Sequence, residues 1–191
     1  MINEKFHFTN FKIHTQYSIC EGAIKIEDLA QYCKENKIPA IGLSDSSNLC
    51  GALEFSESIS KVGTQPIIGT QINFKYSDTI GKLPIFAKTE LGYGNLVKLS
   101  SKSFLESNEK EIPNCSIEEL LKNSKDIVVL SGDGALLMHL GITHTIADQG
   151  LDNLFVYVLD NGCHESVGGQ PTSINNINLK KFALSVGYKK Y

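Results

Sequence analysis

Residues 126–134 read DIVVLSGDG, a short apolar run followed by a glycine-rich turn. A run of this kind, bounded by turn residues, predicts a buried strand. On its N-terminal side, apolar runs alternate with stretches whose apolar residues recur at helical spacing, which is typical of βα units around a parallel sheet. On its C-terminal side, we expect an apolar helix over residues 135–147 and a strand over 154–159. The sequence therefore predicts one strand that serves two α/β segments of a continuous sheet.

The remaining elements follow from the same periodicities. Ser116 opens a short helix with Glu119 three residues later, which is a capping-box pattern. A further helix passes through Leu96 and Leu99, where apolar residues lie three apart. The other strands are expected over residues 8–13, 38–43, 66–74 and 83–87, and the other helices over residues 26–36, 50–62 and 179–186.

The composition limits the classes of partner. The chain has 191 residues and a net charge of −3, and all 18 basic residues are Lys. Arg is the usual residue for bidentate recognition of phosphates and base edges, so we expect no direct nucleic-acid binding. The five cysteines show no CxxC pair, which indicates reduced thiols. No apolar run approaches the length of a membrane span, and the start lacks the form of a signal peptide, so we expect a cytoplasmic protein without a membrane partner.

The front of the chain resembles a known family. The string FKIHTQYSICEGAIKIEDLAQYCKENKIPAIGLSDSSNLCGALEFSESISKVGTQPIIGTQINF, with the later ELGYGNLVKLSS, resembles the N-terminal PHP (polymerase and histidinol phosphatase) domain of the bacterial DNA polymerase III alpha subunit. The match covers residues 8–131. It implies a seven-stranded (βα) barrel, present here only in part, whose strand ends carry a cluster of metal-binding His, Asp and Glu side chains.

This chain has lost most of the metal ligands that the resemblance calls for. The resemblance implies that the family's His-x-His pair falls on Lys12 and His14, the Asp-His of its Thr-Asp-His step on Asp45 and Ser46, and the Glu of its Gly-Cys-Glu step on Gln71. One imidazole and one carboxylate are too few for a hydrolytic metal site, which needs several converging donors. The resemblance therefore implies a degenerate site without a catalytic metal, and a scaffold that docks replisome subunits during DNA replication. No polymerase activity is expected, because the match ends before any polymerase segment.

The tail resembles a second family. Residues 129–191 resemble the C-terminal, thiamine-diphosphate-binding domain of phosphonopyruvate and sulfopyruvate decarboxylases. The resemblance is carried by Gly132, Asp133 and Gly134, by the Asn161 that follows the next strand, and by the loop GCHESVGGQPT. The alternative is a Gly-Asp-Gly turn with no ligand.

The residue types in the tail suit the cofactor that this resemblance implies. A hard cation such as Mg²⁺ takes oxygen ligands. The resemblance implies that the Asp133 carboxylate, the Asn161 side-chain oxygen and the Cys163 backbone oxygen hold Mg²⁺. Gly132 and Gly134 would let the backbone approach the diphosphate, in front of a helix that begins near residue 135. The domain that activates the cofactor has no counterpart in the chain, so a pyrimidine-binding partner subunit would be needed, and no catalytic residue is assigned.

Three hypotheses follow for the whole chain. In the first, residues 1–131 are a PHP-like fragment and residues 132–191 a thiamine-diphosphate/Mg-binding fragment, joined in a truncated hybrid that performs neither full reaction. Such a join arises by recombination or during assembly of the sequence. In the second, the chain is a cofactor-binding decarboxylase module that needs a partner subunit. In the third, it is a non-catalytic docking domain. The expected fold class is α/β: an incomplete (βα) barrel segment followed by a βαβ segment, with mostly parallel strands.

Overall fold

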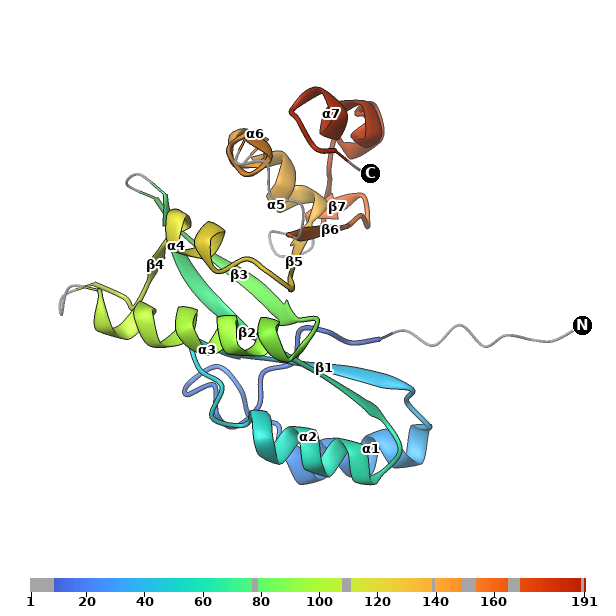
Figure 1. Cartoon of the computed structure of the whole chain (residues 1–191). Helices are drawn as coiled ribbons and strands as arrows, with labels where there is room; N and C mark the ends of the chain where they lie inside the picture. The colour runs from blue at the N-terminus through green and yellow to red at the C-terminus, as the bar shows by residue number, and fades with distance from the viewer. Residues whose placement is uncertain are drawn as a thin grey trace, which may run out of the picture.

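The computed structural model describes residues 9–76, 79–107, 111–138, 140–148, 154–164, 169–189 and 191. Six strands form one sheet in the order β1-β2-β3-β5-β6, and β4 pairs with β2 (Figure 1). The strands are β1 (Ala40–Ser46), β2 (Gln65–Tyr76), β3 (Thr79–Ala87), β4 (Cys115–Ser116), β5 (Ile127–Gly132) and β6 (Phe155–Leu159).

Strand β5 connects the front of the chain to the tail. Its residue Val129 is the registered partner of Ile85 in β3 and of Val156 in β6. The prediction that the DIVVL strand serves both segments of a continuous sheet is therefore confirmed.

The sheet is mixed: three of its five strand pairings are parallel, in line with the expectation of mostly parallel strands, and the two antiparallel pairings were not foreseen. The pairs β1–β2, β2–β4 and β5–β6 are parallel, whereas β2–β3 and β3–β5 are antiparallel. Strand β2 ends at Tyr76 and β3 begins at Thr79. A connection this short cannot hold a crossover helix, and antiparallel pairing is the arrangement that it permits. A separate antiparallel pair joins β7 (Cys163–His164) to β8 (Gln170–Pro171).

The helices divide the core into two clusters. Helices α1 (Ile26–Asn36) and α2 (Ala52–Lys61) bury their apolar faces against β1 around Phe55 and Leu43. Helices α3 (Glu90–Leu105) and α4 (Ile117–Lys122) cover β2, β3 and β5 around Ile72 and Leu96 (Figure 1). Ser116 caps α4 by accepting a hydrogen bond from the Glu119 N–H at 3.3 Å, as its sequence pattern predicts. Both clusters lie in the front of the chain.

The tail holds short helices. The helix expected over residues 135–147 consists of α5 (Asp133–Met138) and α6 (Leu140–Asp148). They are followed by η2 (Ile174–Asn176) and α7 (Leu179–Ser185), and the latter matches the predicted closing helix. The buried apolar residues of the described tail are few: Leu136, Ile146 and Ile174.

The strand expected over residues 8–13 is absent from the described residues 9–13, and Phe8 lies outside them. The segment runs beside β1 and accepts two hydrogen bonds from it, Gly42 N–H to the Asn10 oxygen at 2.7 Å and Ser44 N–H to the Ile13 oxygen at 2.9 Å. A Cβ at Gly42 would lie 2.7 Å from the Phe11 backbone. The segment thus crosses β1 closely at Gly42, and it does not pair with β1 through a regular ladder of backbone hydrogen bonds.

Strand partners define the two faces of the sheet, because directly opposed residues point to the same side. Ile72, Ile85 and Val129 point toward α3 and α4. The opposite, inner face carries Gln71, Phe86, Leu130 and Tyr157, among others. This face would line the interior of a closed barrel.

Two further expectations concern the whole chain. No helix within the described ranges combines the length and the apolar content that crossing a bilayer requires. All five cysteines are described, and none of them forms a disulfide.

Candidate functional site

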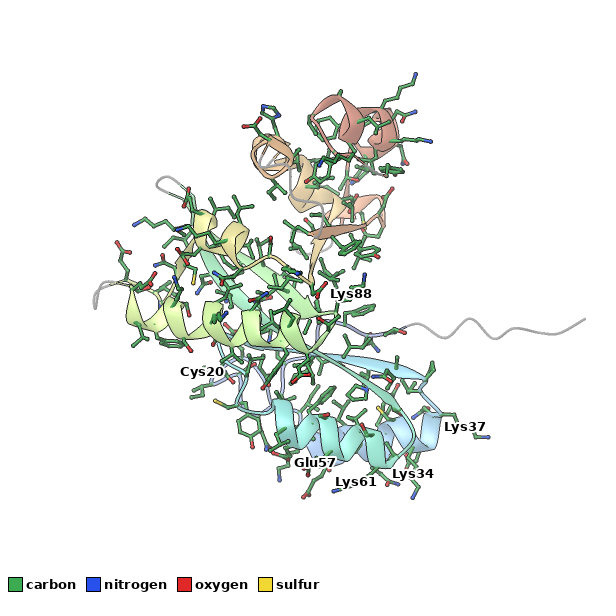
Figure 2. The ribbon with its side chains drawn as sticks, in the orientation of Figure 1. Cys20, Lys34, Lys37, Glu57, Lys61 and Lys88 are labelled. Atoms are coloured by element: carbon green, nitrogen blue, oxygen red, sulfur yellow. The ribbon has the colours of Figure 1, made fainter. Side chains whose placement is uncertain are left out.

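The polar residues of the degenerate barrel site gather where β1 ends. The Asp45 side chain is completely buried. Its carboxylate accepts hydrogen bonds from the Thr15 N–H at 2.6 Å, from the Thr15 hydroxyl at 2.7 Å and from the Ser18 hydroxyl at 2.6 Å. All three donors belong to the loop before α1, which also carries the Cys20 labelled in Figure 2. The carboxylate therefore anchors this loop to the sheet.

His14 lies next to this anchor. Its Nδ1 atom is 3.4 Å from the Ser18 hydroxyl oxygen. Burial, followed by the positive charge of Lys12, lowers the pKa of His14 below its usual value, and the nearby carboxylates oppose this only in part. The imidazole is consequently held in its neutral form at neutral pH. A cation at position 12 replaces the second imidazole that the family pattern has there.

A second set of contacts lies beside this anchor and involves Ser46, which follows Asp45. The Glu21 carboxylate accepts a short hydrogen bond from the Ser46 hydroxyl and another from Lys82 Nζ at 2.9 Å. The Ser46 hydrogen bond, followed by Lys82, lowers the pKa of Glu21. Sequence analysis missed both Glu21 and Lys82. Lys82 lies on the same inner face of β3 as Phe86, and the alternation along that strand was the one available signal.

Gln71 is the registered partner of Ser46 and belongs to the same inner face. Its side chain is nearly buried, and its backbone oxygen accepts a hydrogen bond from the Ser47 N–H at 2.8 Å. Asp45 precedes Ser46 in the strand and so belongs to the opposite face. The fold thus brings the predicted positions to one end of the sheet without making their donors converge.

These residues do not fit a hydrolytic metal. Within the described ranges, no group of three or more His, Cys, Asp and Glu side chains is arranged to hold an ion. Two oxygens of Asp45 are already occupied by Thr15 and Ser18, and Lys12, Ser46 and Gln71 offer no strong metal donor. The site residues can instead hold the loop before α1 against the end of the sheet.

The tail residues lie at a different place along the same sheet. Asp133 directly follows β5, is 2% exposed, and accepts a hydrogen bond from the Thr172 hydroxyl at 2.5 Å. Asn161 follows the end of β6, and its Oδ1 atom accepts a hydrogen bond from the Cys163 N–H at 3.2 Å. Gly132 and Leu159 are registered partners at the ends of these parallel strands. Asp133 and Asn161 therefore follow neighbouring strand ends, as expected, but the Asn161 oxygen turns back to its own loop.

The glycines are placed differently from expectation. Helix α5 begins at Asp133, close to the start that was predicted near residue 135, and Gly134 therefore lies inside its first turn. Gly132 is exposed, and a Cβ built on it would meet no atom within 4 Å. Neither packing nor backbone conformation within the described chain requires a glycine at position 132.

Known proteins that are similar to this chain point to one family, that of PHP domains. A family model described as "PHP domain" matches residues 10–155, which extends beyond the predicted boundary at Gly132. The DNA polymerase III subunit alpha of Rickettsia felis is 37% identical over 124 residues, covering 64% of this chain and 10% of the relative. The corresponding subunit of Borreliella burgdorferi is 34% identical over 196 residues, covering 94% of this chain and 17% of the relative. The chain thus spans only a small part of these polymerases.

One solved structure supports the fold. A Bifidobacterium adolescentis protein, inferred to be a metal-dependent phosphoesterase, superposes with a TM-score of 0.57 at 14% sequence identity. The match covers 93% of this chain and 84% of the other, so it includes the tail as well as the front.

Proposed function

Because the chain belongs to the PHP domain family, we propose that it is a non-catalytic PHP segment of a DNA polymerase III alpha type of protein. In this role it is a structural scaffold that docks other replisome subunits. Polymerisation itself is not assigned to it, since the matched residues cover 10% of the length of the Rickettsia felis polymerase subunit.

One observation carries the proposal: the Asp45 carboxylate is completely buried and is engaged by Thr15 and Ser18. A hydrolytic site needs carboxylates and neutral imidazoles that converge on an ion and a water molecule. Here the surviving carboxylate holds a loop, and Lys82 forms an ion pair with Glu21, which also binds the Ser46 hydroxyl. The site residues contribute to the shape of the domain.

The test compares the natural chain with a variant in which metal ligands are restored. The triple substitution Lys12→His, Ser46→His and Gln71→Glu returns the donor types that the family pattern has at these positions. We expect the natural chain to purify without stoichiometric Zn, Mn or Fe and to leave bis-p-nitrophenyl phosphate intact, and the restored variant to retain more metal. Stoichiometric metal in the natural chain, lost on His14→Ala and Asp45→Asn, would contradict the proposal.

A second candidate function concerns the tail. Testing it also tests the hybrid hypothesis, which requires that the tail bind thiamine diphosphate. Asp133 and Asn161 follow the ends of adjacent parallel strands, which is where open α/β sheets bind ligands. A Cβ built at Gly132 meets no atom within 4 Å, so the backbone at this strand end is open to approach. In this proposal the tail holds thiamine diphosphate and Mg²⁺ together with a pyrimidine-binding partner subunit. Asp133, Asn161 and the Cys163 backbone oxygen would supply the cation's protein ligands, and the bound cofactor would supply carbanion stabilisation.

Differential scanning fluorimetry with Mg²⁺ and thiamine diphosphate tests this second candidate. We expect a small rise in melting temperature that Asp133→Asn and Gly132→Ala both remove. Gly132→Ala is the sharper variant, because the fold has room for its Cβ and the unliganded melting temperature should not change. No rise at saturating cofactor would reject the candidate and leave the PHP proposal intact. Sequencing the source DNA across codons 120–140 would separately establish whether the join exists.

A further inference from the structure

We infer that the ammonium group of Lys82 is a built-in cation that takes the place of a metal ion in the degenerate site. This inference deepens the proposed non-catalytic function and rests on it, because a cation from the chain itself replaces a metal ion only where none is bound. It assigns a role to a residue outside the ligand positions that the family pattern implies.

The register of the sheet places Lys82 beside the former ligand positions. Ser46 in β1 is the registered partner of Gln71 in β2, and Gln71 is in turn the partner of Pro84 in β3. Lys82 precedes Pro84 by two residues, so its side chain leaves the same face of the sheet. Lys82 therefore lies one row away from Ser46 and Gln71, on the inner face.

A single carboxylate joins Lys82 to one of these positions. Lys82 Nζ lies 2.9 Å from Glu21 Oε1, and the other oxygen of Glu21 accepts a short hydrogen bond from the Ser46 hydroxyl. Burial is the main cause of the lowered pKa of His14, but the charges of Lys82 and Glu21 also act on this imidazole, in opposite directions. Carboxylate and imidazole groups, which are common ligands of divalent cations, thus lie near an ammonium group here.

These contacts crosslink segments that a metal ion would also crosslink. The Lys82–Glu21 pair joins β3 to the loop before α1 across 61 residues of sequence, and the hydrogen bond from Ser46 adds β1. Lys12, the other lysine of the site, takes part in no ion pair within the described ranges. Lys82 is therefore the lysine that neutralises Glu21.

An ammonium group supplies positive charge without the chemistry of a metal ion. It donates hydrogen bonds through its N–H groups and has no coordination position at which a water molecule could bind and lose a proton. A site that is filled by Lys82 therefore keeps the connection between loop and sheet, and it does not generate the metal-bound nucleophile that hydrolysis requires.

The variant Lys82→Ala tests the inference, because it leaves the Glu21 carboxylate without its cation. We expect this variant to melt a few degrees below the natural chain, and Mn²⁺ at constant ionic strength to restore part of the loss. Mn²⁺ is the probe because carboxylate oxygens suit it, and because electron paramagnetic resonance measures free Mn²⁺ directly. The natural chain should not respond to Mn²⁺, and Lys82→Arg, which keeps the charge, should behave like the natural chain.

Matched variants separate this site from an ordinary surface ion pair. Lys61→Ala removes an exposed pair with Glu57, in which Nζ and Oε2 lie 4.0 Å apart, and it should not respond to Mn²⁺. Adding Glu21→Gln to Lys82→Ala should abolish the response, since the carboxylate is then lost. Lys82→Met repeats the test with a side chain of similar length, and circular dichroism checks that each variant is folded.

Three results would each overturn the inference. They are the absence of a Mn²⁺ response in both Lys82→Ala and Lys82→Met, a response that survives Glu21→Gln, and an equal response in the natural chain or in Lys61→Ala. All three would leave the proposed non-catalytic function intact, which stoichiometric metal in the purified natural chain would contradict instead.

Discussion

The ammonium group of Lys88 lies 4.2 Å from the centroid of the Phe155 ring. Lys88 directly follows β3, and Phe155 opens β6 on the other side of β5. In Figure 2, Lys88 lies where the tail joins the front of the chain, near the N-terminal end of α3. The contact therefore joins the front of the chain to the tail, and it adds to the strand pairing that already connects them.

A double-mutant cycle measures this connection. Lys88→Met and Phe155→Leu should each reduce stability slightly, with a coupling free energy of about 0.5–1 kcal/mol, as for an exposed cation–aromatic pair. Urea unfolding of the four proteins gives the coupling. Purely additive effects would show that the two side chains do not interact in solution.

The buried Asp45 carboxylate should be essential for folding stability. Asp45→Ala removes the acceptor of three hydrogen bonds and leaves the buried donors of Thr15 and Ser18 without a partner. We expect a loss of about 3–5 kcal/mol in the free energy of unfolding, measured by chemical denaturation. Glu57→Gln is the control, since its exposed ion pair with Lys61 should contribute less than about 1 kcal/mol. Similar stabilities for both variants would contradict the structural role.

The lowered pKa of His14 should make stability depend on pH. The unfolded chain binds a proton to this imidazole at about pH 6.5, whereas the folded chain resists protonation to lower pH. The contribution of the neutral imidazole to the free energy of unfolding is therefore fully present above about pH 6.5. It is lost as the pH falls below this value. His14→Gln should flatten the dependence on the acidic side of about pH 6.5.

Glu21 provides the contrast for this pH profile. Its pKa is also lowered, by Ser46 and Lys82, but its ordinary value lies near 4.5. Glu21→Gln should therefore change the profile only in the more acidic range, where the carboxylate loses its charge. An unchanged slope near neutral pH in the His14→Gln variant would argue against the buried environment of the imidazole.

Two glycines of α3 should respond oppositely to alanine. A Cβ at Gly92 would lie 2.1 Å from the Asp126 backbone oxygen, where α3 meets the start of β5, whereas a Cβ at Gly94 meets nothing within 4 Å. Gly92→Ala should destabilise the chain by about 2 kcal/mol or more, because backbone has to move. Gly94→Ala should stabilise it by about 0.5–1 kcal/mol through helix propensity. Thermal unfolding of both variants tests this packing, and equal effects would contradict it.

Local sequence patterns predicted the elements with strong periodicity. The spacing of Ile26, Leu29, Ala30 and Cys33 predicted α1 with its observed bounds, because a single buried face determines such a helix. The strand around Val129 was also evident from its apolar run. The direction of the strands was not evident from the sequence, since apolar runs such as those of β2 and β3 occur in both parallel and antiparallel sheets. The overlooked signal was the gap between the two predicted strands, residues 75–82, which is already too short for the crossover that parallel pairing needs.

The sequence by itself determined that the front has lost its metal ligands, because Lys12, Ser46 and Gln71 lack the donors that an ion needs regardless of their positions. Only the tertiary structure decided what the surviving groups do. Ser18 Oγ reaches Asp45 and Lys82 reaches Glu21 across segments that are distant in sequence. Hydrogen bonds and ion pairs depend on distances of a few ångströms between such segments, and these are set by how strands and loops pack together. The same reason applies to β6, whose apolar sequence is common to buried and edge strands and whose exposure follows from its place at the end of the sheet.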